Sequence, residues 1–476
     1  MTTTIAAVDP AVHRPAGRLP SRRRLALSAG WPIAMAVAGY PVWWAFGLTP
    51  LCFPLAAIPM YLKLRRSGKV RVPPGFWIWL LFLVWVLASG ITLNLTAPDT
   101  VPPHGAGRFL AYGLRFANYA SLTIMMLYIG NLPEKVLPTK KVIRSLGVLC
   151  VASIVLGLGG VLFPHFTFSS PAAALLPSNI SSAGNNFTSI ALAQVQPVLG
   201  YSAPRPAAPY AFTNAWGNNV ALLLVWLIVG GWIMGGRRRR VGLLAVLAVG
   251  TVPIVYSLDR GMWIGLGLGV CYVAVRLAAR GRLLAIGAIT LTLGVATVVF
   301  TASPLSTIVA ERLAHGHSND SRTSLAGESI RVGLSSPFLG YGSTRQTVGS
   351  QNTIAVGATK ACPKCGNRDI GSTGQIWLLL IAQGFFGTAL YLAYFVKTAW
   401  AFRHDYSPVA ISGSLVVLLS LFFGLFYSAL IMPLAITFVS IGLVWRKALG
   451  TAASGPAALG HRATPAARRP RVAVAP

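Results

Sequence analysis

The apolar stretch "LLAIGAITLTLGVATVVF", residues 283–300, and the polar stretch that follows it, residues 304–373, decide the fold of this chain. The first carries no charge, and its length is close to the roughly 20 residues that a helix needs to cross a bilayer. The second holds four of the nine acidic residues of the whole chain. These four residues are Glu311, Asp320, Glu328 and Asp369. Because the sequence around this polar stretch is mostly apolar, we expect the chemistry of the protein to lie there.

The composition of the whole chain is typical of an integral membrane protein. Hydrophobic residues make up 54% of its 476 residues, charged residues make up 10%, and the mean hydropathy is +0.65. No segment alternates as the strands of a membrane barrel do. We therefore expect an all-α polytopic protein with about twelve transmembrane helices and a large extracytoplasmic loop before the tenth. The expected spans are 28–46, 47–63, 75–95, 109–129, 144–164, 217–235, 241–258, 261–278, 283–303, 374–397, 408–426 and 428–446.

The basic residues indicate how the spans are oriented. A net charge of +31 alone would allow nucleic-acid binding. In the expected topology, however, 29 of the 40 Lys and Arg residues fall on one side, which leaves 11 on the other. This asymmetry places both termini in the cytoplasm, and the basic loops then attract anionic membrane lipids. We predict a multi-pass protein of the cytoplasmic membrane without a nucleic-acid partner, and a domain 28–449 between disordered tails, 1–27 and 450–476.

Two loops on the outer side are long. Residues 165–216 are rich in Ser, Asn, Ala and Pro and are interpreted as irregular structure, with an extended approach to the next span. The second loop, 304–373, contains a predicted helix from Arg322 to Ser335, which Pro337 follows. On that helix Glu328 and Arg331 are three residues apart, so an ordinary ion pair is one interpretation of them.

Two sets of charges lie close to the membrane. Arg115 falls inside the expected span 109–129, where a buried arginine is costly. It either extends to the outer interface or lines a cavity that opens outward. Asp259, Arg260 and Gly261 form the expected outer turn between two spans, either as a plain turn with a salt bridge or as part of a site. None of the acidic residues falls in the middle of a span, which argues against an ion-coupled transporter.

Cys362 and Cys365, in "ACPKCGNRD", are the only cysteines outside the expected spans. Their spacing resembles half of a zinc ribbon, but a zinc site needs four ligands and there is no second pair. His315 and His317 are the alternative source of ligands. On the oxidising outer side of the membrane a disulfide between the two cysteines is favoured, and no metal site is predicted.

Four segments in order resemble the O-antigen ligase and O-antigen polymerase-like membrane glycosyltransferases. They are "PYAFTNAWGNNVALLL" at 209–224, "YSLDRGMWIGL" at 256–266, "SRTSLAGESIRVGLSSPFLGYGS" at 321–343 and "TGQIWLLLIAQGFFG" at 373–387. The resemblance covers roughly residues 75–446. It implies an enzyme that takes a glycan from an undecaprenyl diphosphate and joins it to a glycan or lipid acceptor outside the cell. Ligase and polymerase activity differ only in the acceptor.

The resemblance also implies roles for individual residues. The family's turn arginine falls on Arg260 and its loop arginine on Arg322. A His-Asn pair of the family is replaced here by Thr373 and Gly374, which puts a histidine base in doubt. Fixed arginines stabilise the diphosphate leaving group without a metal, a cofactor or a covalent intermediate. We expect Glu328 to be the base for the acceptor hydroxyl, with Glu311 as the second choice. The expected substrate contacts are Arg115, Arg331, Asn214 and Glu311.

Two other classes of function stay open. A transporter or flippase for a lipid-linked or anionic envelope precursor should carry charges along a path through both leaflets. Here the charges noted within or next to the spans, Arg115, Asp259 and Arg260, lie toward the outer side. A non-catalytic membrane component of envelope assembly is the third hypothesis.

Overall fold

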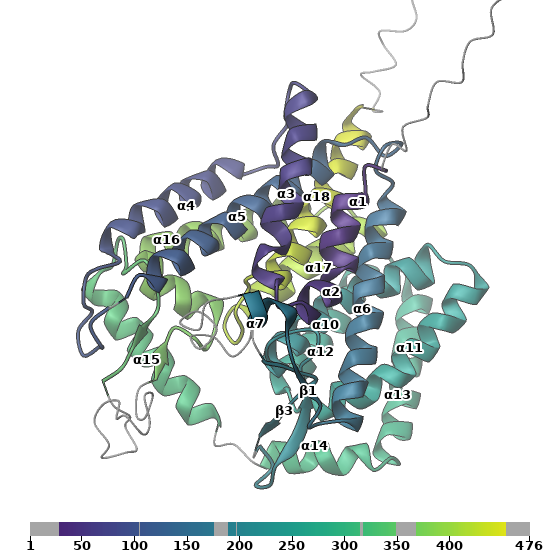
Figure 1. Cartoon of the computed structure of the whole chain (residues 1–476). Helices are drawn as coiled ribbons and strands as arrows, with labels where there is room; N and C mark the ends of the chain where they lie inside the picture. Colours follow the sequence, from purple (N-terminus) through teal and green to yellow (C-terminus); the bar gives the residue numbers. More distant parts are fainter. Residues whose placement is uncertain are drawn as a thin grey trace, which may run out of the picture.

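A computed structural model describes residues 28–103, 105–175, 189–196, 198–314, 318–348 and 368–453. These residues are mostly helical, as predicted, and the helices pack into one bundle (Figure 1). The elements of the first half are α1 (Trp31–Ile33), η1 (Ala34–Ala38), α2 (Tyr40–Ala45), α3 (Thr49–Arg66), α4 (Phe76–Ala88), η2 (Ser89–Thr92), α5 (Gly107–Asn131), α6 (Thr139–Leu162), β1 (Thr167–Ser169), α7 (Pro171–Leu175), β2 (Ser189–Ala191), β3 (Ala193–Gln196) and β4 (Ala203–Pro206). Those of the second half are α10 (Thr213–Ile228), η3 (Val229–Ile233), α11 (Arg237–Tyr256), α12 (Arg260–Ala278), α13 (Leu283–Thr301), α14 (Leu305–Ala314), α15 (Ser318–Ser335), β5 (Arg345–Gln346), β6 (Asp369–Ile370), α16 (Gln375–Ala401), α17 (Pro408–Phe423) and α18 (Met432–Ala453).

Every one of the expected apolar segments falls on helix, and seven of the described helices are long and apolar enough to cross a membrane. The seven are Thr139–Leu162, Thr213–Ile233, Arg237–Tyr256, Arg260–Ala278, Leu283–Thr301, Gln375–Ala401 and Met432–Gly450. The other expected segments are shorter, broken by η1, or more polar.

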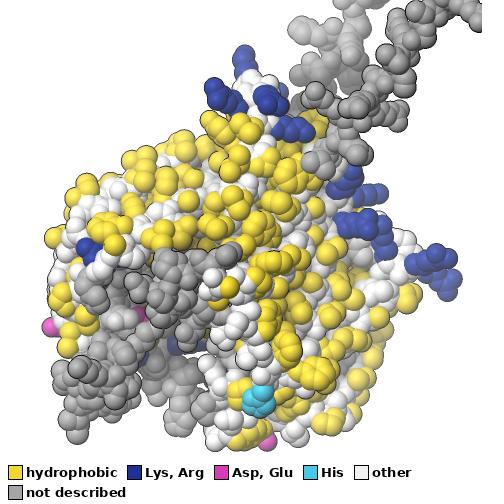
Figure 2. Space-filling model, in the orientation of Figure 1, with side chains coloured by type: hydrophobic (Ala, Val, Ile, Leu, Met, Phe, Trp, Pro, Cys, Tyr) yellow, Lys and Arg dark blue, Asp and Glu magenta, His cyan; other side chains and the backbone are white. Residues whose placement is uncertain are grey.

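The surface of the bundle is apolar over wide areas, as Figure 2 shows. None of the residues of α13 is buried, and its Leu284 is 93% exposed. Exposed apolar area of this extent is not stable in water, whereas lipid tails cover it at little cost. The core lies instead among α3–α6, α10 and α16–α18, where Trp79, Trp216 and Trp226 are fully buried.

The two ends of the bundle differ in charge. The basic residues of the α3 C-terminus and of the α6 and α11 N-termini lie at the end where the described chain begins and ends (Figures 1 and 2). Strands β1 and β3, α14 and the start of α15 lie at the opposite end (Figure 1). The molecule therefore has a basic end and a second end, here called the loop end, where its irregular segments gather.

The structure corrects the prediction that residues 165–216 are irregular. β1 pairs with β2 and β3 with β4, both antiparallel, and Gln194 lies opposite Arg205. The extended approach to the next span was predicted, and it forms β4. The second loop, 304–373, is also more ordered than predicted. It contains α14 ahead of the one predicted helix, β5 pairs with β6 in it, and α15 begins at Ser318 rather than Arg322.

The end of α15 is fixed against a break in α16. Gly384 interrupts α16 with a φ of 68°, a left-handed conformation that favours glycine. The freed carbonyl groups of Ile381 and Ala382 accept from the backbone N–H groups of Tyr341 and Gly342, at 2.7 and 2.8 Å. This contact holds the segment after α15 against α16 and so positions the polar loop over the bundle.

Candidate functional site

Four arginines from four separate elements converge at the loop end: Arg205 of β4, Arg260 of α12, Arg312 of α14 and Arg322 of α15. Burial is the main cause that lowers the pKa of Arg312 to about 10, and the charges of the other three arginines lower it further. The side chain of Arg312 is held in place because its Nε donates to the carbonyl of Leu258 at 3.0 Å. The positive charges of these arginines repel one another, so the cluster favours a bound anion.

Asp259 is the acidic group of this cluster. It is the N-cap of α12, and its Oδ1 accepts from the backbone N–H of Met262 at 3.3 Å and from the Tyr427 hydroxyl. Among the described residues, no partner reaches its Oδ2. Burial raises the pKa of Asp259, and the bond from Tyr427 and the charge of Arg205 oppose that rise. A carboxyl in this setting can exchange a proton closer to neutral pH than an exposed aspartate can.

Arg205 is fixed by three hydrogen bonds. Its Nε donates to the carbonyl of Ser257 at 2.7 Å, Nη1 to Gln196 Oε1 at 2.8 Å and Nη2 to Asn214 Oδ1 at 3.4 Å. The pairing of β3 with β4 places Gln194 and Gln196 beside it. Gln194 also accepts from the backbone N–H of Thr213, at 2.8 Å. The hairpin therefore ties the cluster to the start of α10.

A cavity of about 560 Å³ adjoins the cluster. Its polar lining includes Arg205, Asn214 and Tyr427, and the rings of Tyr40 and Trp44 form part of an apolar wall. Its size suits a small-molecule group rather than a single ion. The arrangement offers an anion site of fixed cations beside a partly apolar cavity.

The predicted site residues are divided among several places. Arg260 and Arg322 each lie near Arg312 of the cluster, and Asn214 lines the cavity beside it. Glu328 instead pairs with Arg331 at 2.8 Å, as the ordinary interpretation predicted, and Arg331 also pairs with Asp99.

The remaining predicted residues lie elsewhere. Arg115 donates to the carbonyl of Gly342 at 3.3 Å, and Glu311 accepts from the Tyr201 hydroxyl at 2.9 Å. Thr373 lies just before α16, and its hydroxyl is buried. Cys362 and Cys365 lie outside the described residues. In the described part of the chain, no three His, Cys, Asp or Glu residues are grouped to hold a metal ion.

Sequence reasoning missed Arg205 and Tyr427, gave Arg312 no role, and treated Asp259 only as part of the turn with Arg260. One feature of the sequence could have drawn attention to Arg205 and Arg312. Basic residues are scarce on the expected outer side, where only 11 of the 40 fall. Three of those few cations proved to be buried, and two of the three belong to the cluster, Arg205 at 7% exposure and Arg312 at 6%. A search of known protein families, curated proteins and solved structures finds no match to this chain.

Proposed function

We propose that this chain is a membrane glycosyltransferase of twelve spans, which transfers a glycan from a polyprenyl-diphosphate-linked donor to an acceptor on the outer face. The convergence of Arg205, Arg260, Arg312 and Arg322 around one buried carboxyl carries the proposal. The resemblance of four segments to O-antigen ligases and polymerases supports it, since Arg260 and Arg322 are the two arginines of that resemblance. Both termini are cytoplasmic in this proposal, and the loop end faces outward.

In this reaction the bond from the sugar to the diphosphate breaks, and negative charge grows on the departing oxygen. Arginine stays protonated and its planar fork fits phosphate oxygens, so fixed arginines stabilise the leaving group more as the charge develops. An added anion would offset the repulsion between Arg312 and the neighbouring cations. The donor's diphosphate would therefore lie against the cluster, and the adjoining cavity would hold a sugar.

The acceptor hydroxyl must lose a proton in the same step. Glu328 is occupied by Arg331, which makes it a poorer base than the sequence suggested. Asp259 is the carboxyl inside the cluster, and Tyr427, which donates to it, lines the cavity. In this proposal the Asp259–Tyr427 pair takes up the proton.

Deletion of the gene, followed by analysis of lipid-linked glycans, tests the proposal. Donor that accumulates on the outer leaflet, with loss of the surface polymer, supports transfer. Accumulation on the inner leaflet would instead indicate a flippase. Complementation with Arg322→Lys should restore little polymer, because an ammonium group does not reproduce the bidentate fork.

A further inference from the structure

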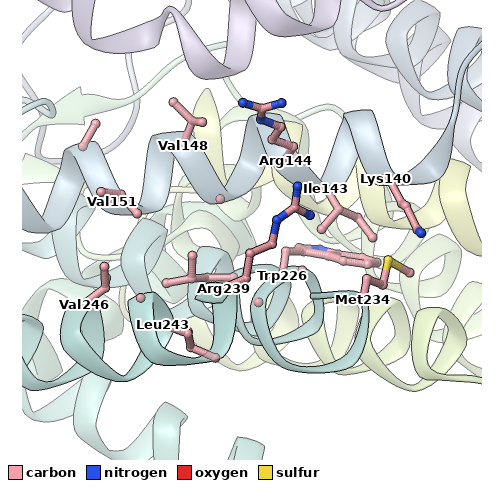
Figure 3. A pocket seen from close by; sticks show the side chains of 16 residues that line it. Lys140, Ile143, Arg144, Val148, Val151, Trp226, Met234, Arg239, Leu243 and Val246 are labelled. Carbon is pink, nitrogen blue, oxygen red and sulfur yellow. The ribbon is translucent and has the colours of Figure 1, made fainter. Parts of the chain in front are cut away.

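A separate groove lies at the basic end, between α6, η3 and α11, and holds about 600 Å³ (Figure 3). Its walls are mostly apolar, and they include Val148 and Val151 of α6, Leu243 and Val246 of α11, and the edge of Trp226. The groove thus follows the helices from the basic end toward the middle of the apolar spans. An apolar channel of this kind fits a hydrocarbon chain.

Three cations lie at the polar end of the groove. Lys140 and Arg144 come from the first turns of α6, and Arg239 extends toward α6 from the first turn of α11 (Figure 3). None of the described residues that line the groove is acidic. The nearby carboxylate of Glu134 is engaged instead by Thr139 and Arg446. The N-termini of α6 and α11 add their partial positive charge.

Glycines keep the groove open. Gly147, Gly230, Gly231 and Gly242 all line it. A Cβ at Gly242 would meet nothing within 4 Å, so a side chain there would enter the groove itself rather than the protein around it. The wall at Gly230 and Gly231 is the π-helical turn η3, a local distortion that is often found at functional sites.

From this combination we infer that the groove binds one anionic phospholipid, with its phosphate against Lys140, Arg144 and Arg239 and an acyl chain between α6 and α11. Charge complementarity selects the headgroup, because cations between helices at this end suit an anionic lipid. A second groove of about 440 Å³, on the α1 side of α6, shares Arg144 and Val148 with the first and gives the other acyl chain a place. This site is distinct from the arginine cluster, and it does not depend on glycan transfer.

Native mass spectrometry of the full chain, exchanged into phosphatidylglycerol or phosphatidylcholine, tests the inference. The wild-type protein should retain one phosphatidylglycerol in preference to phosphatidylcholine. Arg239→Gln should weaken that binding about fivefold, since one cation near a membrane surface contributes about that factor. Arg238→Gln is the matched control: it removes the same charge one residue away, outside the groove lining, and should leave the retained lipid unchanged.

Gly242→Leu separates a lipid from a free anion. It fills the apolar part of the groove and leaves all three cations in place, so it should abolish retention of the lipid while inorganic phosphate binds as before. Equal losses in Arg238→Gln and Arg239→Gln would overturn the site in favour of diffuse surface attraction. Full lipid retention by a monodisperse Gly242→Leu variant would also overturn it. If that variant aggregates, Gly242→Val provides the same comparison.

Discussion

Tyr427→Phe removes one hydroxyl from the centre of the arginine cluster and leaves the ring in place. The ring packs against Phe423 at 5.5 Å between centroids, and this contact survives the change. The lost hydrogen bond is the one donated to Asp259, which is only 4% exposed. A hydrogen bond to a charged group stabilises a protein by about 1.5–3 kcal/mol, so we expect a loss of about 2 kcal/mol in the free energy of unfolding.

The loss should depend on pH. The bond from Tyr427 lowers the pKa of Asp259, so it favours the ionised carboxylate over the protonated form. Burial holds that pKa above the usual aspartate value, so the protonated form persists to a higher pH in the folded chain than in the unfolded chain. The stability of the wild type should therefore fall as pH rises through this range. The difference between wild type and Tyr427→Phe should grow over the same range.

Thermal unfolding followed by tryptophan fluorescence, in detergent from pH 4 to pH 8, measures this effect. Tyr61→Phe, at a residue of α3 that is 50% exposed, is the matched control and should change nothing. A loss of stability in Tyr427→Phe that is the same at every pH would refute the argued role of Asp259. If Tyr427→Phe is as stable as the wild type at every pH, the stabilising hydrogen bond from Tyr427 to Asp259 would be refuted.

Three further predictions concern the site and the topology. Gly261→Ala should destabilise the protein, because the new Cβ would collide with the Tyr427 hydroxyl. Gly267→Ala on the same helix should be tolerated, because a Cβ there has no neighbouring atom within 4 Å. Thermal unfolding compares the two variants. Arg260→Ala and Arg322→Ala should each abolish complementation of the deletion strain at normal expression, and the double variant should be scarcely worse, because residues that act as a unit are not additive; activity that follows the amount of folded protein would contradict this. Thr307→Cys should react with an impermeant reagent from outside the cell and Ser67→Cys only from inside, and either residue labelled from the wrong side would reverse the orientation.

The sequence was sufficient to predict the long apolar helices but not the site. Long apolar runs specify helices locally, since a bilayer leaves few alternatives, and every expected span is helical. Strands β1, β2 and β3 escaped prediction because they are only three or four residues long, which is too short for a clear alternation. Helix α14 escaped because it is one short amphipathic helix inside a polar loop.

The cluster could be predicted only in part, for a different reason. The resemblance indicated Arg260 and Arg322, and the structure places each of them near Arg312. Arg205, Arg312 and Tyr427 are far apart in sequence and are assembled by the hairpin, by α14 and by the turn before α18. No local pattern shows that such residues will meet. The pairing of Glu328 with Arg331, by contrast, follows from their spacing on one helix.

Glycan transfer by the purified protein is the most direct test of the central claim. The protein would be reconstituted in liposomes with lipid-linked glycans extracted from the deletion strain and with membranes of that strain as the source of acceptor. The account predicts transfer of the glycan with release of polyprenyl diphosphate, and a rate at least about 100-fold lower for Arg322→Ala. Folded wild-type protein that binds the donor and transfers nothing, or an Arg322→Ala variant that matches the wild-type rate, would contradict it.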